Sequence, residues 1–160
     1  MRSAGYTYLA VLFVVALMGV GLKATAELWH TAQTREKERE LLYAGAQYRR
    51  AIEAYHVNSP GGAKQYPREL AQLLQDPRRQ EIRRYLRRLY RDPMTPDGEW
   101  GIVRAPDGGI AGVYSRSEAK PFKTADFRPE DAEFTDAVKY SDWKFVAAGA
   151  IPPPEAVAPQ

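Results

Sequence analysis

An uncharged, apolar segment close to the start of the chain constrains its folding more than any other feature. From Ser3 to Leu22 no side chain carries a charge, and most residues from Tyr6 onward are large and apolar. About 20 residues in an α-helix extend about 30 Å, which matches the hydrocarbon core of a bilayer. We therefore expect residues 6–22 to form a transmembrane helix.

The sequence after this segment supports two interpretations. Ala24-Thr-Ala26 has the small-x-small pattern that precedes a signal-peptidase site, and cleavage there would release a soluble periplasmic binding domain beginning at Glu27. However, residues 24–56 contain no proline and only Gly45 as a weak helix breaker. The helical pattern thus continues without a loop, and we expect residues 23–57 to extend the first helix.

The second half of this helix has one apolar face. Apolar or small residues recur every three or four positions, as in a helix that is covered on one side. These residues are Leu41, Ala44, Tyr48, Ala51, Ile52 and Tyr55. The preceding run from Arg35 to Glu40 alternates in sign, which is typical of a solvated helix surface.

Residues 58–148 have the pattern of a small α+β domain. Asn58-Ser-Pro-Gly-Gly62 ends the helix, and short helices are predicted over 66–75 and from Asp76-Pro77 to about Tyr90. In the second of these, one face should be buried, formed by Ile82, Tyr85, Leu86 and Leu89.

The rest of this region predicts a sheet. Strands over 99–104 and 110–115 should form a hairpin around Pro106-Asp-Gly-Gly109, and 139–146 can add a third strand. Between them, residues 118–137 predict an excursion with one helical turn after Pro129, and the proline-rich segment 149–160 predicts a disordered tail. The fold class is α+β: a long N-terminal helix, short helices packed on it, and a small antiparallel sheet of about three strands.

A cluster of arginines on the second short helix is the strongest charge signal. We expect a basic surface there, formed by Arg79, Arg83, Arg84, Arg87 and Arg88. No base-reading side chains are interleaved with these arginines, so we expect no nucleic-acid partner, although a nucleic-acid-binding membrane protein is the alternative. The acidic residues Glu130, Asp131, Glu133 and Asp136 can pair with the arginines, within the chain or in an adjacent subunit.

The sequence gives no basis for catalysis. The chain has no Cys, and its two histidines, His30 and His56, are separated by about 39 Å along the predicted helix. No serine lies in a nucleophile-elbow context, and no glycine-rich phosphate loop opens a helix. We expect a protein that is not an enzyme and has neither catalytic residues nor a metal or cofactor site.

The start of the chain resembles the type IV pilins and the pseudopilins of type II secretion. Met1-Arg-Ser-Ala-Gly5 is similar to the short leader (residues 1–5) of that family, and Tyr6-Thr-Tyr-Leu9 to its first mature residues. Tyr66-Pro67 with Leu70, and Tyr85-Leu-Arg-Arg-Leu-Tyr-Arg-Asp-Pro93, resemble segments that follow the long helix in the major, G-type pseudopilins. The resemblance implies a pilin-like fold.

The resemblance also implies a function. Prepilin peptidase would cut between Gly5 and Tyr6, and Tyr6 would be N-methylated. The chain would be a single-pass inner-membrane protein with its C-terminal domain in the periplasm. Its partners would be other pseudopilins, the inner-membrane secretion platform and membrane lipid. Together they would build a filament that helps to push exoproteins through the outer membrane.

Three further points follow from this resemblance. Ala10 stands where most members of the family have Glu, which would suit a minor or tip subunit, and a minor pilin of a type IV pilus is an alternative. Helix packing in the filament would rely on the small residues Ala10, Ala16, Gly19 and Gly21. G-type pseudopilins bind calcium in a Gly/Asp-rich loop that is not recognisable here, so a bound calcium ion is only a secondary hypothesis.

Overall fold

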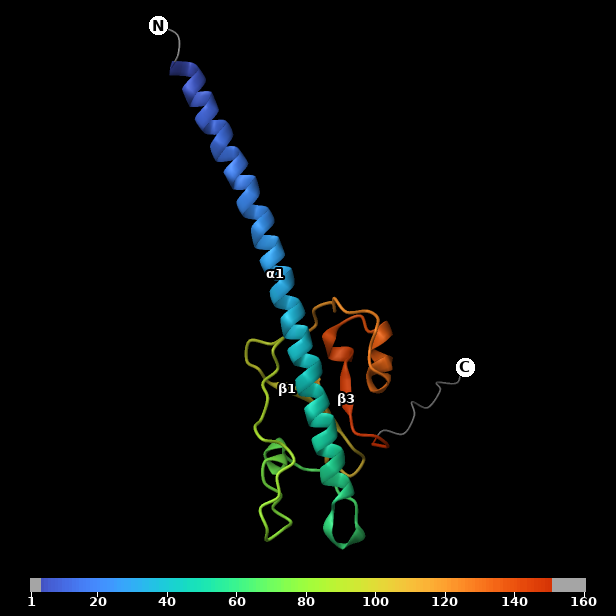
Figure 1. The fold of residues 1–160 in the computed structure, drawn as a ribbon. Helices are drawn as coiled ribbons and strands as arrows, with labels where there is room; N and C mark the ends of the chain where they lie inside the picture. Colours follow the sequence, from blue (N-terminus) through green and yellow to red (C-terminus); the bar gives the residue numbers. More distant parts are fainter. Residues whose placement is uncertain (1–3, 151–160) are drawn as a thin grey trace, which may run out of the picture. The chain divides into compact units, whose positions relative to one another are not determined.

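The computed structural model describes residues 4–150, and within them the side chains of residues 8–16, 31–61 and 63–150 (Figure 1). Helix α1 is continuous from Ala4 to Val57. The chain divides into two compact units, Met1–Glu36 and Lys37–Gln160. Among the side chains described, no helical stretch combines the length and the hydropathy of a membrane span. The expected membrane segment, residues 6–22, lies partly outside the described side chains.

The apolar face predicted for the second half of α1 is confirmed. Leu41, Ala44, Tyr48, Ala51, Ile52 and Tyr55 are at most 3% exposed. All of them except Ala44 belong to one core with side chains from the sheet and from the loops that surround it. Burying this stripe is the main apolar contribution of α1 to the second unit.

A three-stranded antiparallel sheet covers this stripe, so the α+β class is confirmed. Its strands are β1 (Trp100–Arg104), β2 (Ile110–Ser115) and β3 (Lys144–Val146), with β2 in the centre. Ile102 of β1 lies opposite Val113 of β2, which lies opposite Phe145 of β3. The predicted hairpin turn has Gly108 at φ +80°, a backbone conformation that suits glycine.

Short 3₁₀ helices supply the rest of the regular structure. They are η1 (Pro60–Gly62), η2 (Leu70–Leu73), η3 (Pro129–Asp136) and η4 (Tyr140–Asp142). Helix η3 lies where the sequence predicts one helical turn after Pro129. The third strand is shorter than the predicted 139–146, because residues 140–142 form η4 before the chain enters the sheet.

The helix predicted from Asp76-Pro77 to Tyr90 does not form. The backbone N–H groups of Tyr85 and Leu86 both donate to the carbonyl of Leu73, instead of to carbonyls four residues earlier. Leu86 is buried, but Ile82 is 71% exposed and Leu89 43%. The predicted apolar face is therefore confirmed at Tyr85 and Leu86 but wrong at Ile82 and Leu89. Long-range backbone hydrogen bonds fold this segment back along η2.

Aromatic side chains fill the space between α1, the sheet and η3. Trp143, Phe145 and Tyr140 are fully buried, and Trp143 stacks on Phe134 with ring centroids 5.4 Å apart. The ring of Phe145 lies directly against the backbone of Gly45, where an added Cβ would come within 2.4 Å of it. Gly45, a weak helix breaker by its sequence, is therefore the point of close contact between α1 and β3.

This contact predicts the effect of a small substitution. Although alanine is the better helix former by about 1 kcal/mol, Gly45→Ala should lower the free energy of unfolding by about 1–2 kcal/mol, because its methyl group overlaps the Phe145 ring. Denaturant titration of the full chain in detergent measures this change. The smaller side chain in Phe145→Leu should reduce the penalty of Gly45→Ala, whereas the exposed control Glu40→Ala should stay near wild type. A stabilised Gly45→Ala protein would contradict the proposed contact.

Candidate interaction surfaces

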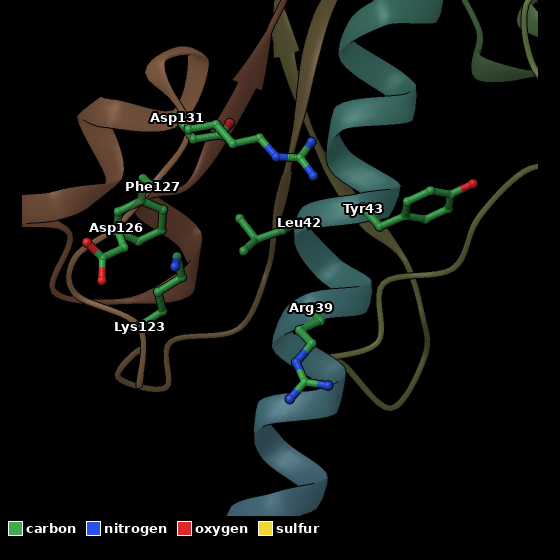
Figure 2. Close-up of a pocket in the computed structure, with 8 residues that line it drawn as sticks. Arg39, Leu42, Tyr43, Lys123, Asp126, Phe127 and Asp131 are labelled. Carbon is green, nitrogen blue, oxygen red and sulfur yellow. The ribbon is translucent and has the colours of Figure 1, made fainter.

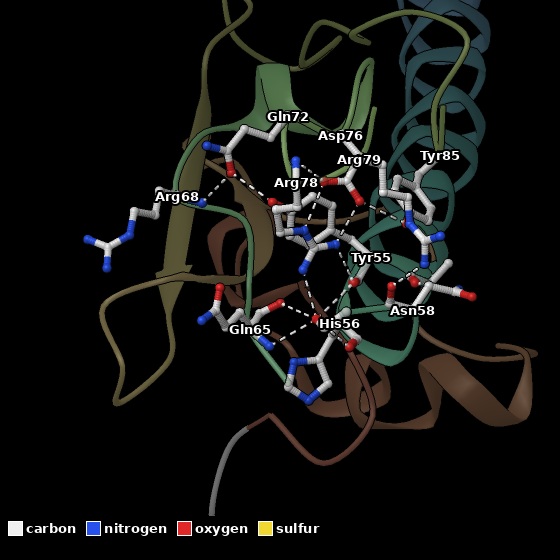
Figure 3. Close-up of polar contacts among 12 residues, drawn as sticks. Tyr55, His56, Asn58, Gln65, Arg68, Gln72, Asp76, Arg78, Arg79 and Tyr85 are labelled. Atoms are coloured by element: carbon white, nitrogen blue, oxygen red, sulfur yellow. Dashed lines mark hydrogen bonds and ion pairs between the residues drawn. The ribbon is translucent and has the colours of Figure 1, made fainter. Parts of the chain in front are cut away.

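The C-terminal end of α1 is held by one arginine (Figure 3). Arg78 donates from Nη2 to the carbonyl of Tyr55 at 2.9 Å and from Nη1 to Oγ of Ser59 at 2.7 Å. Its guanidinium carbon lies 3.5 Å from the centroid of the Tyr55 ring. A cation at this position satisfies free carbonyl groups and complements the negative end of the helix dipole.

Asp76 fixes the position of Arg78. The carboxylate accepts from Nε of Arg78 and from Nη2, both at 2.8 Å, and also from the hydroxyl of Tyr85 at 3.2 Å. Asp76 is 1% exposed. The hydrogen bond from Arg78 holds the pKa of Asp76 below its usual range, and the same pair raises the pKa of Arg78. Both groups therefore stay charged in the folded protein at neutral pH.

The other end of the arginine-rich segment is fastened to α1 by Tyr90. The hydroxyl of Tyr48 donates to the carbonyl of Tyr90 at 2.9 Å and accepts from its N–H at 3.0 Å. Nε1 of Trp100 donates to the same carbonyl at 2.9 Å. Burial raises the pKa of Tyr48 to about 12. Although it is not helical, the segment from Asp76 to Tyr90 is attached to α1 at both ends.

The predicted basic surface consists of exposed side chains. The exposed arginines are Arg79, Arg83, Arg84, Arg87 and Arg88. Arg79 donates to the backbone carbonyl of Asn58, and Arg83 donates to its side-chain oxygen. The guanidinium carbon of Arg88 lies 5.1 Å from the centroid of the Tyr90 ring. Within the described part of the chain, Arg84 and Arg87 have no carboxylate partner. We call these five residues the basic surface.

The intramolecular pairing predicted between these arginines and the acidic segment was wrong. Asp131 is instead 2.8 Å from Nη1 of Arg49 on α1, although the two atoms are not aligned for a hydrogen bond. Glu130 lies 4.0 Å from Arg128, and Glu133 and Asp136 are exposed. In the described residues no ion pair joins the acidic segment to the basic surface.

Glu38 has a structural role that the sequence pattern did not predict. It lies in the alternating run expected to be a solvated surface, but it is 5% exposed. Its Oε1 accepts the backbone N–H groups of Phe122 and Lys123 at 3.0 and 2.9 Å, and the hydroxyl of Tyr140 at 3.3 Å. The sequence did contain a signal for this burial. Glu38 lies three residues before Leu41 and so continues the buried stripe, with its three-and-four spacing, toward the N-terminus.

Two hollows lie on the side of α1 that carries η3. One has a volume of about 360 Å³, and its lining combines apolar and charged side chains of both signs (Figure 2). These are Arg39, Leu42, Tyr43, Lys123, Asp126, Phe127, Arg128 and Asp131. The other, of about 430 Å³, lies among Glu53 of α1, Glu130 and Glu133 of η3, and residues 146–150 after β3. No group of three or more His, Cys, Asp or Glu side chains suited to a metal occurs among the residues that the structure describes.

The candidate sites near the N-terminus are only partly described. Ala10 and Ala16 are exposed residues of α1. Gly5, Tyr6, Gly19 and Gly21 belong to the helical backbone of α1, but their surroundings lie outside the described side chains.

Comparison with known proteins found no matching family model, curated protein or solved structure. The function of the chain therefore has to be inferred from its own residues. The N-terminal helix and the charged surfaces of the second unit are the features of the chain that bear on its function.

Proposed function

We propose that this chain is a structural subunit of a type II secretion-type filament, a pseudopilin with a pilin-like fold. Residues 6–22 would anchor it in the inner membrane, and residues 58–148 would lie in the periplasm. The observation that carries the proposal is the exposure of apolar side chains at the start of α1. Tyr8, Leu9, Val11, Leu12, Phe13, Val14 and Val15 are 48–68% exposed.

These side chains surround the helix. Residues 8–15 make about two turns, so successive side chains cover every direction around the axis. A helix that is apolar on all sides is normally buried in lipid or among other helices. Among the residues that the structure describes, the apolar side chains of residues 8–15 stay exposed, which supports a role in which lipid and neighbouring subunits cover them.

Small residues in the same helix support close packing between subunits. Without a hydrophobic driving force in lipid, helices associate where small residues let their backbones approach. Ala10, Ala16, Gly19 and Gly21 provide such positions. Because Ala10 replaces the usual carboxylate of the family, this packing would be the main attraction between the membrane helices.

We therefore expect Gly21→Leu to reduce co-assembly about tenfold, since loss of one close helix contact of about 1–2 kcal/mol changes an association constant by that factor. Co-purification of two differently tagged copies from membranes measures the effect. Val20→Leu, which places the same leucine side chain at the neighbouring position, is the control and should assemble normally. Unchanged co-assembly and secretion in Gly21→Leu would refute the packing role.

Mass spectrometry of the native N-terminus tests the proposal as a whole. A mature chain beginning at Tyr6, methylated or not, supports processing by prepilin peptidase. A chain beginning at Glu27 would instead identify a secreted soluble domain. Loss of twitching with secretion intact in a deletion strain would assign the subunit to a type IV pilus.

A further inference from the structure

The second unit carries opposite charges on two flanks of α1. The basic surface belongs to the segment between Asp76 and Tyr90, which is fastened to α1 through Tyr55 and Tyr48. The acidic residues Glu130 and Glu133 belong to η3, which faces Arg49 through Asp131. In Figure 1 the lime-green segment and the orange helix η3 lie on opposite sides of α1.

The geometry of α1 explains why the two surfaces do not meet in one molecule. Successive helical residues project about 100° apart, so Glu53 and Tyr55 project about 160° apart. Tyr55 contacts Arg78 and Tyr85 of the arginine-rich segment, whereas Glu53 lines the hollow beside η3. The body of the helix separates the two, and among the described residues the acidic segment pairs with Arg49 and Arg128 instead of with the basic surface.

The hollow beside η3 has the charge and size to accept arginine. It is about 430 Å³ in volume, and Glu53, Glu130 and Glu133 line it. Of the two basic residues that also line it, Arg49 is paired with Asp131. Arg128 lies 4.0 Å from Glu130, so Lys144 is the lining cation that remains to offset Glu53 and Glu133. A planar guanidinium group can form a bidentate pair of hydrogen bonds with a carboxylate, so an arginine side chain suits this site.

We propose that the basic surface of one copy binds the acidic hollow of a second copy of this chain. Arg84, Arg87 and Arg88 would enter the hollow formed by Glu53, Glu130 and Glu133. This inference rests on the proposed filament function, and it identifies a contact between its periplasmic domains. Residues 151–160, which follow the hollow in the sequence, contain no Lys or Arg, so none of them can supply it with a cationic side chain.

The contact joins two different surfaces, so it is heterologous. Each copy that binds through its basic surface still presents a free acidic hollow, and addition can continue. Such a contact builds a ring or an open helical assembly, whereas a self-complementary contact would stop at a dimer. The proposed pairing therefore has the geometry that a filament requires.

Cysteine cross-linking in membranes tests the contact directly, because the natural chain has no Cys. The full-length double variant Arg87→Cys/Glu133→Cys should give a ladder of disulfide-linked oligomers under mild oxidation. Each single variant should give about tenfold less cross-linked product, because a free thiol then faces no partner thiol. Arg87→Cys/Arg104→Cys places the second thiol on β1 and is the matched control that should give no ladder.

Charge reversal then tests the chemistry of the contact. Arg84→Glu/Arg88→Glu in the double-cysteine chain should reduce the ladder about tenfold, since like charges would face each other. Adding Glu53→Lys/Glu130→Lys should restore it. A ladder that is insensitive to both changes would overturn the electrostatic contact.

A separate cysteine distinguishes this inference from the proposed function. Ala16→Cys alone should cross-link two copies through α1 wherever subunits associate in the membrane. Cross-linking at Ala16 without an Arg87–Glu133 ladder would overturn the contact and leave the filament proposal standing. Absence of both would overturn both. Binding of the wild-type chain, but not of an Arg84→Gln/Arg87→Gln/Arg88→Gln variant, to phosphatidylglycerol vesicles, with no ladder, would assign the arginines to lipid instead.

Discussion

Arg78→Ala is expected to lower the free energy of unfolding by about 3–5 kcal/mol, a large effect for a single substitution. The change leaves Asp76, which is 1% exposed, without its cation, and an unpaired buried charge is costly. It also removes the hydrogen bonds to Tyr55 and Ser59 at the end of α1. Denaturant titration of the full chain in detergent at pH 7 measures the loss.

The pH dependence of this effect identifies its cause. The pKa of Asp76 lies below its usual range in the folded protein, so the stability it contributes is fully present above the ordinary carboxyl pKa of about 3.9. That contribution is lost as the pH falls through the lowered pKa. The difference between wild type and Arg78→Ala should thus narrow when both are compared at pH 3. If the difference in unfolding free energy were the same at both pH values, Arg78 would act by packing alone. Arg79→Ala, at an exposed neighbouring residue, is the control and should change stability by less than about 1 kcal/mol.

Glu38→Ala is expected to cost about 2–4 kcal/mol. The substitution removes the acceptor of two backbone N–H groups, those of Phe122 and Lys123, and of the hydroxyl of Tyr140. Partly buried donors that lose their acceptor cost about 1–3 kcal/mol each. Hydrogen exchange at the two amides should accelerate together with the loss in global stability.

Glu38→Gln separates the hydrogen bonds from the charge. The amide oxygen can still accept from the two backbone N–H groups, so most of the stability should remain. Burial, together with the negative charge of Glu38, raises the pKa of Tyr140 to about 12, and the glutamine variant should lower that value. If Ala and Gln variants were equally unstable, the charge and not the accepted hydrogen bonds would be responsible.

The sheet and the buried stripe of α1 could be predicted because each depends on a local pattern. Pro106-Asp-Gly-Gly109 specifies a turn, and the residues on either side alternate as strands do. The three-and-four spacing from Leu41 to Tyr55 specifies one covered helix face. Neither pattern needs information from a distant part of the chain.

The segment from Asp76 to Tyr90 could not be predicted in the same way. Its apolar residues have helical spacing, but its conformation depends on carbonyls and side chains far along the sequence, such as Leu73 and Tyr48. The exposure of the five arginines, in contrast, could be predicted, because charged side chains favour the surface. The pairing of Asp131 with Arg49 depends on where η3 packs, which no local pattern specifies.

The shape of the sheet also limits strand pairing between neighbouring molecules. In the described part of the chain the two outer strands are β1, with five residues, and β3, with three. Pro152, Pro153 and Pro154 follow β3 closely in the sequence and have no backbone N–H to donate. An edge this short offers little backbone to a strand from a neighbour, so crowded copies are guarded against amyloid-like growth.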